Sequence, residues 1–188
     1  MIQFYKPNKK VTGTACSFSF NEVEGSFWAE LVKQKSWDES KRVGRFHSDA
    51  DKKVKVKFSR LEICDMIHAL KSNSEFSAYH SNPKQVCQIK FAPFFNKEKV
   101  QMGFSIGVNK EAKDDSTNKQ FFSIGFRFNE MEELLLWFQY AVNLDFEIKR
   151  KARIKEYSKK KKESQAQQEP QQEPEPAKTQ TDDDSDIW

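Results

Sequence analysis

Hydrophobic and polar residues alternate with a period of two over much of the chain before residue 130. In the first half this pattern covers residues 15–20, 27–32, 42–47 and 53–58, and turn residues at 21–25 separate the first two segments. Such alternation, interrupted by turn residues, is typical of β-strands with one buried face. The pattern therefore predicts four strands in the first half of the chain.

After the fourth strand the period changes from two to that of a helix. Ser59 and Glu62 have the spacing of a capping box, and Phe58 is placed to pack on Ile63. Apolar residues at helical spacing then form one face: Leu61, Ile63, Met66, Ile67 and Leu70. The first half of the chain is therefore predicted to have the order ββββα, with the helix ending at Ser72.

The second half of the chain repeats this order. Strands are predicted at residues 75–81, 85–91, 100–108 and 120–128. A second capping box, Asn129 to Glu132, would then start a helix. The apolar face of this helix is predicted to contain Leu134, Leu135, Trp137, Phe138, Ala141 and Val142. The predicted fold class is α+β, with two ββββα units and antiparallel sheets.

Charge divides the 188 residues into blocks that the net charge of +4 conceals. Residues 1–148 contain 22 basic and 19 acidic residues. Residues 149–163 contain nine basic and two acidic residues, whereas residues 164–188 contain one basic and seven acidic residues. Residues 164–181 contain no aromatic or branched aliphatic side chain, a composition that cannot form a core. We therefore predict a globular domain at 1–148, a basic helical extension or linker at 149–163, a disordered linker at 164–181 and an acidic tip at 182–188.

Sequence patterns typical of enzymes and metal sites are missing. None of the six glycines lies in a phosphate-binding loop, and the three histidines and three cysteines lack metal-ligand spacing. The odd, widely spaced cysteines predict no disulfide framework, and no leader or membrane span is recognisable. We therefore expect a soluble non-enzyme of a reducing compartment, with no catalytic residue, metal or cofactor, located in the cytoplasm or nucleoid.

Basic and aromatic residues are interleaved on the predicted strands. Cations can contact phosphates while flat rings stack on unpaired bases, so this pattern favours single-stranded nucleic acid. The candidate binding residues are Lys33, Lys35, Trp37, Arg42, Arg45, Phe46, Lys53, Lys55, Lys57, Tyr79, His80, Lys84, Lys90 and Phe91. Lysines 53, 55 and 57 alternate with core residues and must share the opposite face. The alternative for these lysines is an ordinary solvated face of an edge strand.

The C-terminal residues form an acidic run that ends in an aliphatic and an aromatic side chain. This tip contains Asp182, Asp183, Asp184, Asp186, Ile187 and Trp188. Acidic groups beside a terminal aromatic ring suit a basic pocket with an apolar notch on a partner protein. The alternative is a solubilising acidic tail.

The paired ββββα pattern over residues 1–146 resembles the Whirly and positive-coactivator superfamily of single-stranded DNA-binding proteins. The acidic tip resembles that of bacterial and phage single-stranded DNA-binding proteins, although Ile187-Trp188 replaces their Ile-Pro-Phe ending. The resemblance implies a protein that coats single-stranded DNA without sequence specificity in replication, recombination or repair. It also implies partner proteins recruited by the tip and a homodimer or homotetramer. The compact sequence without a recognisable targeting peptide favours a phage or prokaryotic source, hence host cytoplasm if phage-encoded.

Two other functions fit the same pattern. An RNA-binding protein or a transcription regulator that binds single-stranded DNA would use the same predicted sheets. An interaction scaffold would carry the basic residues only for solubility.

Overall fold

Two antiparallel sheets and parts of two helices make up the first compact unit, Met1–Lys149, of the computed structural model, which describes residues 1–83, 85–113 and 119–166. The first sheet contains β1 (Ile2–Lys6), β2 (Thr14–Asn21), β3 (Ser26–Asp38), β4 (Val43–Phe46) and β5 (Lys53–Phe58). Strands β1, β2 and β3 are neighbours in that order, β5 pairs with the first part of β3, and β4 pairs with its last part.

The second sheet follows α1 (Arg60–Ser72) and has a simple up-and-down order. Its strands are β6 (Phe76–Ser81), β7 (Gln85–Phe95), β8 (Gln101–Ala112) and β9 (Lys119–Phe126). The helix α2 (Phe128–Ala166) follows β9, and a 3-10 turn, η1 (Ala50–Lys52), precedes β5. The predicted α+β architecture with two β-sheet-and-helix units is confirmed, with β1 as an additional strand.

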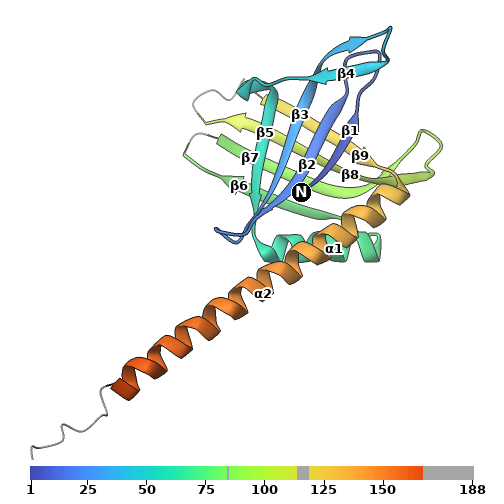
Figure 1. Cartoon of the computed structure of the whole chain (residues 1–188). Helices are drawn as coiled ribbons and strands as arrows, with labels where there is room; N and C mark the ends of the chain where they lie inside the picture. The colour runs from blue at the N-terminus through green and yellow to red at the C-terminus, as the bar shows by residue number, and fades with distance from the viewer. Residues whose placement is uncertain (84, 114–118, 167–188) are drawn as a thin grey trace, which may run out of the picture. The chain divides into compact units, whose positions relative to one another are not determined.

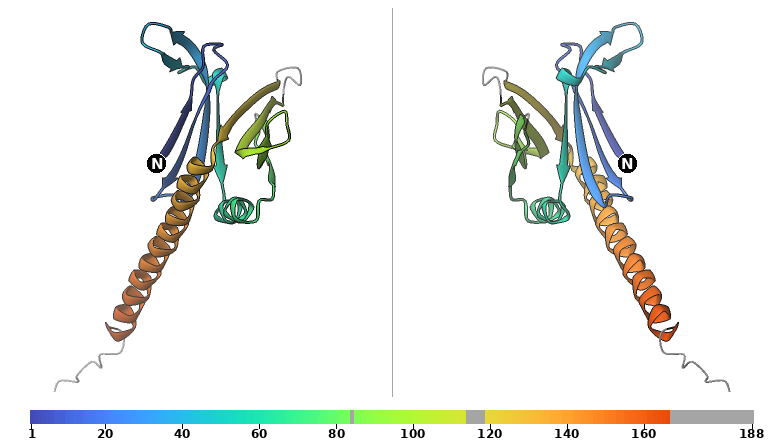
Figure 2. Two further views of the ribbon diagram at one scale, coloured as in Figure 1. Left: turned by 90° about the vertical axis from the view of Figure 1, so that its right-hand side faces the viewer. Right: turned by 90° about the vertical axis from the view of Figure 1, so that its left-hand side faces the viewer.

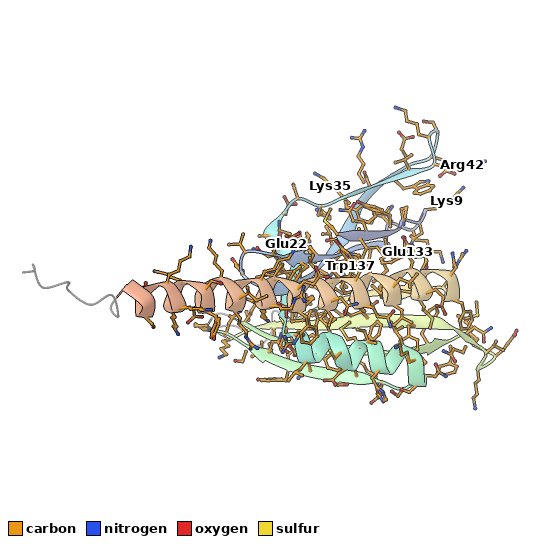
Figure 3. The ribbon with its side chains drawn as sticks, turned by 60° about the horizontal axis from the view of Figure 1, so that its bottom comes forward. Lys9, Glu22, Lys35, Arg42, Glu133 and Trp137 are labelled. Atoms are coloured by element: carbon orange, nitrogen blue, oxygen red, sulfur yellow. The ribbon has the colours of Figure 1, made fainter. Side chains whose placement is uncertain are left out.

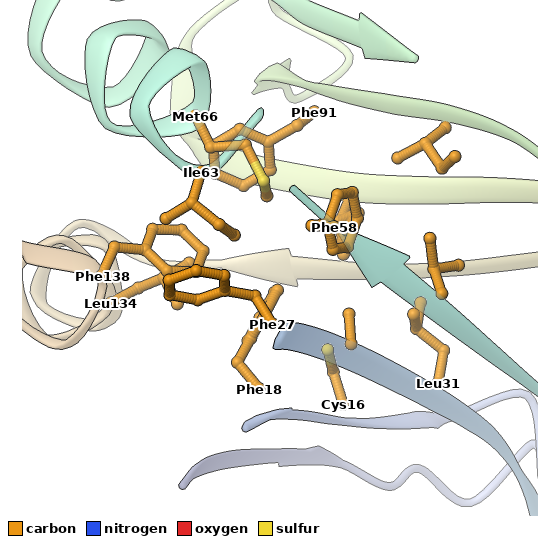
Figure 4. Packing of buried hydrophobic residues seen from close by; sticks show 14 of the residues in the cluster. Cys16, Phe18, Phe27, Leu31, Phe58, Ile63, Met66, Phe91, Leu134 and Phe138 are labelled. Carbon is orange, nitrogen blue, oxygen red and sulfur yellow. The ribbon is translucent and has the colours of Figure 1, made fainter. Parts of the chain in front are cut away.

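The inner faces of the two sheets form one shared core. Strands of the second sheet cross those of the first (Figure 1), and the sheets form two separate layers in side view, with α1 at one end (Figure 2). Phe4 on β1 packs edge-on against Phe126 on β9, with ring centroids 4.9 Å apart, and Phe18 meets Phe138 of α2 at 5.1 Å. Figure 4 shows this cluster of phenylalanines with Ile63 and Met66 of α1. The predicted period-two alternation therefore places Phe18 and Phe126 in the core.

Helix α1 begins as the sequence predicted. The Ser59 side chain accepts a hydrogen bond from the Glu62 backbone N–H, and the Glu62 carboxylate accepts one from the Ser59 N–H at 2.7 Å. The helix ends at Asn73, whose left-handed backbone forms the C-cap. The expected apolar face was wrong in one position, because Leu61 is 72% exposed while Ala69 is buried.

Helix α2 begins two residues earlier than predicted. The Glu130 carboxylate accepts a hydrogen bond from the Arg127 N–H at 2.7 Å, and Arg127 O accepts one from the Met131 N–H. The capping box predicted at Asn129 is therefore wrong, since Asn129 already lies in the first turn. An ion pair with Lys6 also fixes Glu130, and this helix start is thereby tied to β1.

A buried carboxylate connects the two helices inside the first unit. Asp145 of α2 is 1% exposed, and its Oδ2 atom lies 3.1 Å from the Arg60 guanidinium and 2.7 Å from Lys149 Nζ. Gly25, at the turn between β2 and β3, has φ of +60°, and a Cβ there would lie 3.2 Å from Asp145 Oδ1. Both the backbone conformation and the close carboxylate therefore favour glycine at this turn.

The second unit, Arg150–Trp188, is described as far as Ala166 and consists of the remaining part of α2. All of its side chains up to Ser164 are exposed, with ion pairs joining Lys159 to Glu163 and Lys160 to Glu156. The helix thus continues past the predicted start of the linker at residue 164. Among the described helices, none combines the length and the apolar character needed to cross a membrane.

Candidate nucleic-acid interface

The outer faces of the two sheets carry the residues that point away from the core. We call the outer face of β1, β2, β3 and β5 the lysine face, and the outer face of β6–β9 the groove face. Alternation along each strand decides which residues reach these faces, and cross-strand register decides which of them become neighbours.

On the lysine face, β5 carries three lysines, and two of them lie over one indole ring. Val54, Val56 and Phe58 are buried, so Lys53, Lys55 and Lys57 lie on the opposite side, as the sequence predicted. The Nζ atoms of residues 55 and 57 lie 4.6 and 5.4 Å from the ring centroid of Trp28 on β3. The indole N–H donates to Ser26 Oγ at 2.9 Å, which holds the ring in place.

Carboxylates reduce the positive charge of the lysine face. Lys53 Nζ lies 3.9 Å from Glu30, and Lys57 Nζ lies 3.8 Å from Glu24. Lys55 is the direct cross-strand partner of Glu30 in the register of β3 and β5. Each lysine therefore has a nearby acidic group, and the face is only weakly basic.

The groove face has a different chemistry, arranged in rows across four strands. One row contains Tyr79, Gln88, Asn109 and Phe121, one residue from each of β6, β7, β8 and β9. The next row contains Ser77, Lys90, Gly107 and Ser123. Two exposed rings thus stand on the two edge strands, and small residues form most of the floor beside them.

These residues line a groove of about 650 Å³. Tyr79 is 64% exposed and Phe121 is 57% exposed, so both rings are accessible. A Cβ atom on Gly107 would lie 3.2 Å from the Phe121 ring, because the ring extends over this glycine. Since neighbouring strands are about 4.8 Å apart, the backbones of β6 and β9 are separated by about 14 Å. The groove therefore offers aromatic surface beside a floor of small residues.

Two further hollows adjoin the groove and share residues with it. A hollow of about 490 Å³ shares Phe121 and Ser123 with the groove and is lined by Lys33, Lys52 and His47. The other hollow is smaller, at about 290 Å³, shares the amides of Gln88 and Asn109, and is lined by Lys110, Glu111 and Lys119. Lysines thus line both hollows. Lys110 Nζ donates to Lys53 O at 3.4 Å, and Lys119 Nζ pairs with Glu111 at 3.2 Å.

Three candidates from the sequence lie on the groove face or next to it, and one of them is Tyr79. Lys90 is exposed in the row beside Tyr79, and its Nζ pairs with Glu75 at 2.8 Å. Lys33 lies in the adjoining hollow, with its Nζ 4.8 Å from the ring centroid of Phe122. Tyr79, Lys90 and Lys33 are therefore the sequence candidates that the structure brings together with the groove.

The hairpin of β3 and β4 carries another group of candidates: Lys35, Trp37, Arg42, Arg45 and Phe46. Figure 3 shows Lys35 and Arg42 on this hairpin. Trp37 was expected in a polar loop, but it lies on β3, half-buried, and its indole N–H donates to Glu39 at 2.6 Å. Phe46 packs near Tyr5, with ring centroids 5.8 Å apart. These residues are separate from the groove.

His80 and Phe91, two predicted binding residues, lie on the face of the second sheet opposite to the groove face. Phe91 is fully buried and packs on Phe104, so its ring cannot reach a base. His80 points toward α1, where its Nε2 lies 2.6 Å from Glu62 Oε1. Burial raises the pKa of Glu62, but hydrogen bonds from His80 and Ser59 outweigh this effect and hold that pKa below its usual range. Both residues lie on the face of the sheet opposite to that of Tyr79.

Some predictions fall on parts of the chain outside the described residues. These are Lys84 and the acidic tip, with Asp182, Asp183, Asp184, Asp186, Ile187 and Trp188. Their proposed roles stay predictions.

Sequence reasoning missed Phe121, Gln88, Asn109 and Gly107. A signal for Phe121 existed, since it alternates with the buried Phe122 and Ile124 and must face outward. In the same way, Gln88 is next to the buried Ile89 on β7 and must therefore face outward. No pattern along a single strand shows that these residues share one row with Tyr79, because that depends on pairing between strands.

Within the described ranges, no cluster of three or more histidine, cysteine or acidic side chains could hold a metal ion. Cys16, Cys64 and Cys87 are free, and burial raises the pKa values of the Cys16 and Cys87 thiols. Thiols kept protonated in this way are poor nucleophiles.

Comparisons with known proteins identify the fold. No protein-family model matches the chain, and no curated protein matches it in sequence. The structure is similar to the crystal structure of the Whirly protein WHY1 from Arabidopsis thaliana, with a TM-score of 0.57 and 13% identity over 84% of this chain and 90% of that one. For WHY3 from the same plant the values are 0.56 and 13%, over 81% and 91%.

The structure of the plant transcriptional regulator PBF-2 is also similar, with a TM-score of 0.53 and 13% identity over 77% of this chain and 81% of that one. At this level of identity the likeness shows the fold. The chain therefore has the Whirly-like fold that its sequence pattern implied.

Proposed function

We propose that this protein binds single-stranded DNA through the groove face and coats it. The observation that carries the proposal is the row in which Tyr79 and Phe121 stand exposed on either side of a groove with a floor of small residues. Unpaired bases have accessible ring faces, whereas the bases of a duplex are stacked on each other. The groove thus suits single strands and excludes a rigid duplex.

Binding combines stacking with phosphate contacts. A base lying on the Tyr79 or Phe121 ring gains about 1–3 kcal/mol, with little dependence on base identity. The backbone then lies near Lys33 and Lys52 on one side of the groove and near Lys110 and Lys119 on the other. Each lysine that neutralises a phosphate releases counterions, which makes the affinity fall as salt is added.

The Whirly-like fold supports this proposal by analogy of architecture. The finer role that we propose is coating of single strands in DNA replication, recombination or repair, with partner proteins recruited by the acidic tip at residues 182–188. We further propose a homodimer or homotetramer located in the cytoplasm or nucleoid.

A second candidate function is transcription regulation through single-stranded DNA or RNA. The likeness to PBF-2, a plant transcriptional regulator, favours it specifically. Competition between DNA and RNA oligonucleotides of the same sequence separates an RNA-binding regulator from the proposed DNA-coating protein.

Fluorescence anisotropy tests the proposal directly. Labelled oligo-dT, the matching RNA and duplex DNA are titrated with the full chain at two salt concentrations. We expect tight, salt-sensitive binding to oligo-dT and much weaker binding to the duplex. Equal affinity for duplex and single strand, or a clear preference for RNA, would contradict the proposal.

A further inference from the structure

We propose that Gln88 and Asn109 recognise the edge of one base held in the groove, and so give this surface a preference among bases. The inference rests on the proposed function and extends it. The sequence predicted binding without sequence specificity, because stacking and phosphate contacts alone distinguish bases poorly.

The two amides are direct neighbours in the centre of the groove face. Gln88 on β7 and Asn109 on β8 are cross-strand partners, so their Cβ atoms are about 4.5–5.5 Å apart. They occupy the middle two positions of the row whose ends are Tyr79 and Phe121. A base that stacks on either ring therefore lies beside the amides.

Both amides are available to a ligand. Gln88 and Asn109 are exposed, and within the described part of the chain neither side chain has a hydrogen bond or an ion pair. Each amide offers a carbonyl acceptor and two N–H donors. The pair can thus present donors and acceptors side by side, as a base edge does.

Neighbouring residues leave space for the base and for its phosphate. Ser77, Gly107 and Ser123 keep the floor low in the adjoining row. On the other side the amides border the hollow that contains Lys110 and Lys119. A nucleotide can therefore place its ring over the small residues, its edge at the amides and its phosphate near a lysine.

Amide side chains discriminate bases when they form two hydrogen bonds to one base. In an unpaired strand the Watson–Crick edge is accessible for this purpose. A well-formed pair of such bonds changes affinity for the correct base by about tenfold or more. Simple solvation of a polar strand face would produce no such difference between bases.

The test uses the full chain and three labelled homopolymers: oligo-dA, oligo-dC and oligo-dT. Gln88→Met with Asn109→Leu keeps the side-chain sizes but removes the donors and acceptors. Gln3→Met, on the lysine face, is the matched control, and thermal unfolding checks that each variant is folded. We expect the wild-type protein and the control to bind one homopolymer about tenfold more tightly than the weakest. We expect the double variant to bind all three with similar affinity.

Three outcomes have distinct meanings. A double variant that keeps the wild-type differences would overturn the inference. Tight binding of the wild-type protein to all three homopolymers with equal affinity would also overturn it, while leaving the proposed function intact. Failure of the wild-type protein to bind any of the three would contradict the proposed function itself.

Discussion

The outer faces of the two sheets are built by the same alternation but present different chemistry. The lysine face concentrates cations around Trp28, and these cations lie near Glu24 and Glu30. The groove face has fewer cations, yet it has two exposed rings, a floor of small residues and free amides. Exposed ion pairs contribute little, whereas stacking contributes about 1–3 kcal/mol per base. The proposal assigns the DNA to the groove face because Tyr79 and Phe121 are exposed there, whereas the lysines of the other face lie near carboxylates.

Removal of the Tyr79 and Phe121 rings from the groove face should cause the largest loss of affinity for single-stranded DNA. With Tyr79→Ala and Phe121→Ala together, we expect the affinity for oligo-dT to fall at least about 30-fold, because two bases can no longer stack on the protein. Fluorescence anisotropy measures this fall in affinity. Tyr5→Ala, an exposed ring of the first sheet, is the control and should change the affinity little. An equal fall in the control would remove the distinction between the faces.

Filling the floor of the groove should have an intermediate effect. Gly107→Val introduces a Cβ about where the structure leaves 3.2 Å to the Phe121 ring, so the ring must move and the groove becomes shallower. We expect affinity for oligo-dT to fall by about tenfold, the equivalent of weaker stacking of one base. Ser17→Val on β2 is the corresponding change in the other sheet. If both variants bind like the wild type, the groove is not the contact surface.

Replacing lysines on the two faces should change the salt dependence of DNA affinity to different extents. For Lys53→Gln, Lys55→Gln and Lys57→Gln combined, we expect less than about a threefold change in affinity and a nearly unchanged salt slope. For Lys33→Gln with Lys52→Gln, the two lysines of the hollow beside Phe121, we expect the slope against log salt to fall by about 0.7 for each phosphate that the protein no longer neutralises. The measurement is a salt series of anisotropy titrations. The opposite ranking would move the phosphate path to the lysine face.

The smallest expected effect is a loss of stability at the contact between Glu62 of α1 and His80 of β6, the strand that carries Tyr79. The pKa of Glu62 is lowered in the folded protein, since the hydrogen bonds from His80 and Ser59 outweigh the opposing effect of burial. Its contribution to stability is thus fully present above the unfolded pKa of about 4.3 and is lost as pH falls through the lower folded value. We expect Glu62→Gln to lower the free energy of unfolding by about 0.5–1 kcal/mol at pH 7, because the pair is partly solvent-screened.

Urea unfolding at pH 7 and at pH 3 measures this effect. The difference between Glu62→Gln and the wild-type protein should shrink at the lower pH, where the wild-type carboxylate is becoming protonated. Glu75→Gln, which alters an exposed pair with Lys90, should show almost no difference at either pH. A constant difference for Glu62→Gln would argue against a stabilising role of the ionised Glu62 carboxylate.

Most of the fold follows from local periodicity. Alternation predicted eight of the strands, and the Ser59–Glu62 capping box located the start of α1. Strand β1 escaped prediction because Ile2 and Phe4 form too short a pattern by themselves. The start of α2 was misplaced because Asn129 resembles a cap, whereas the Lys6–Glu130 pair, a contact distant in sequence, favours the earlier start.

The candidate site was less predictable for a physical reason. Parity along β5 was enough to place the three lysines on one face. The groove instead depends on the register of four strands, which brings Tyr79 and Phe121 into one row although 42 positions separate them. Parity should also have excluded Phe91, which shares the face of Ile89 and is buried. Phe91 was predicted to bind because of its aromatic ring alone, without regard to the strand face on which it lies.

Ultraviolet cross-linking of oligo-dT to the full chain, followed by mass spectrometry of the linked peptides, tests the central claim most directly. The account predicts cross-links at Tyr79 and Phe121, the two rings of the groove face. Cross-links confined to Trp28 and the peptide with lysines 53, 55 and 57 would contradict it and assign the DNA to the lysine face.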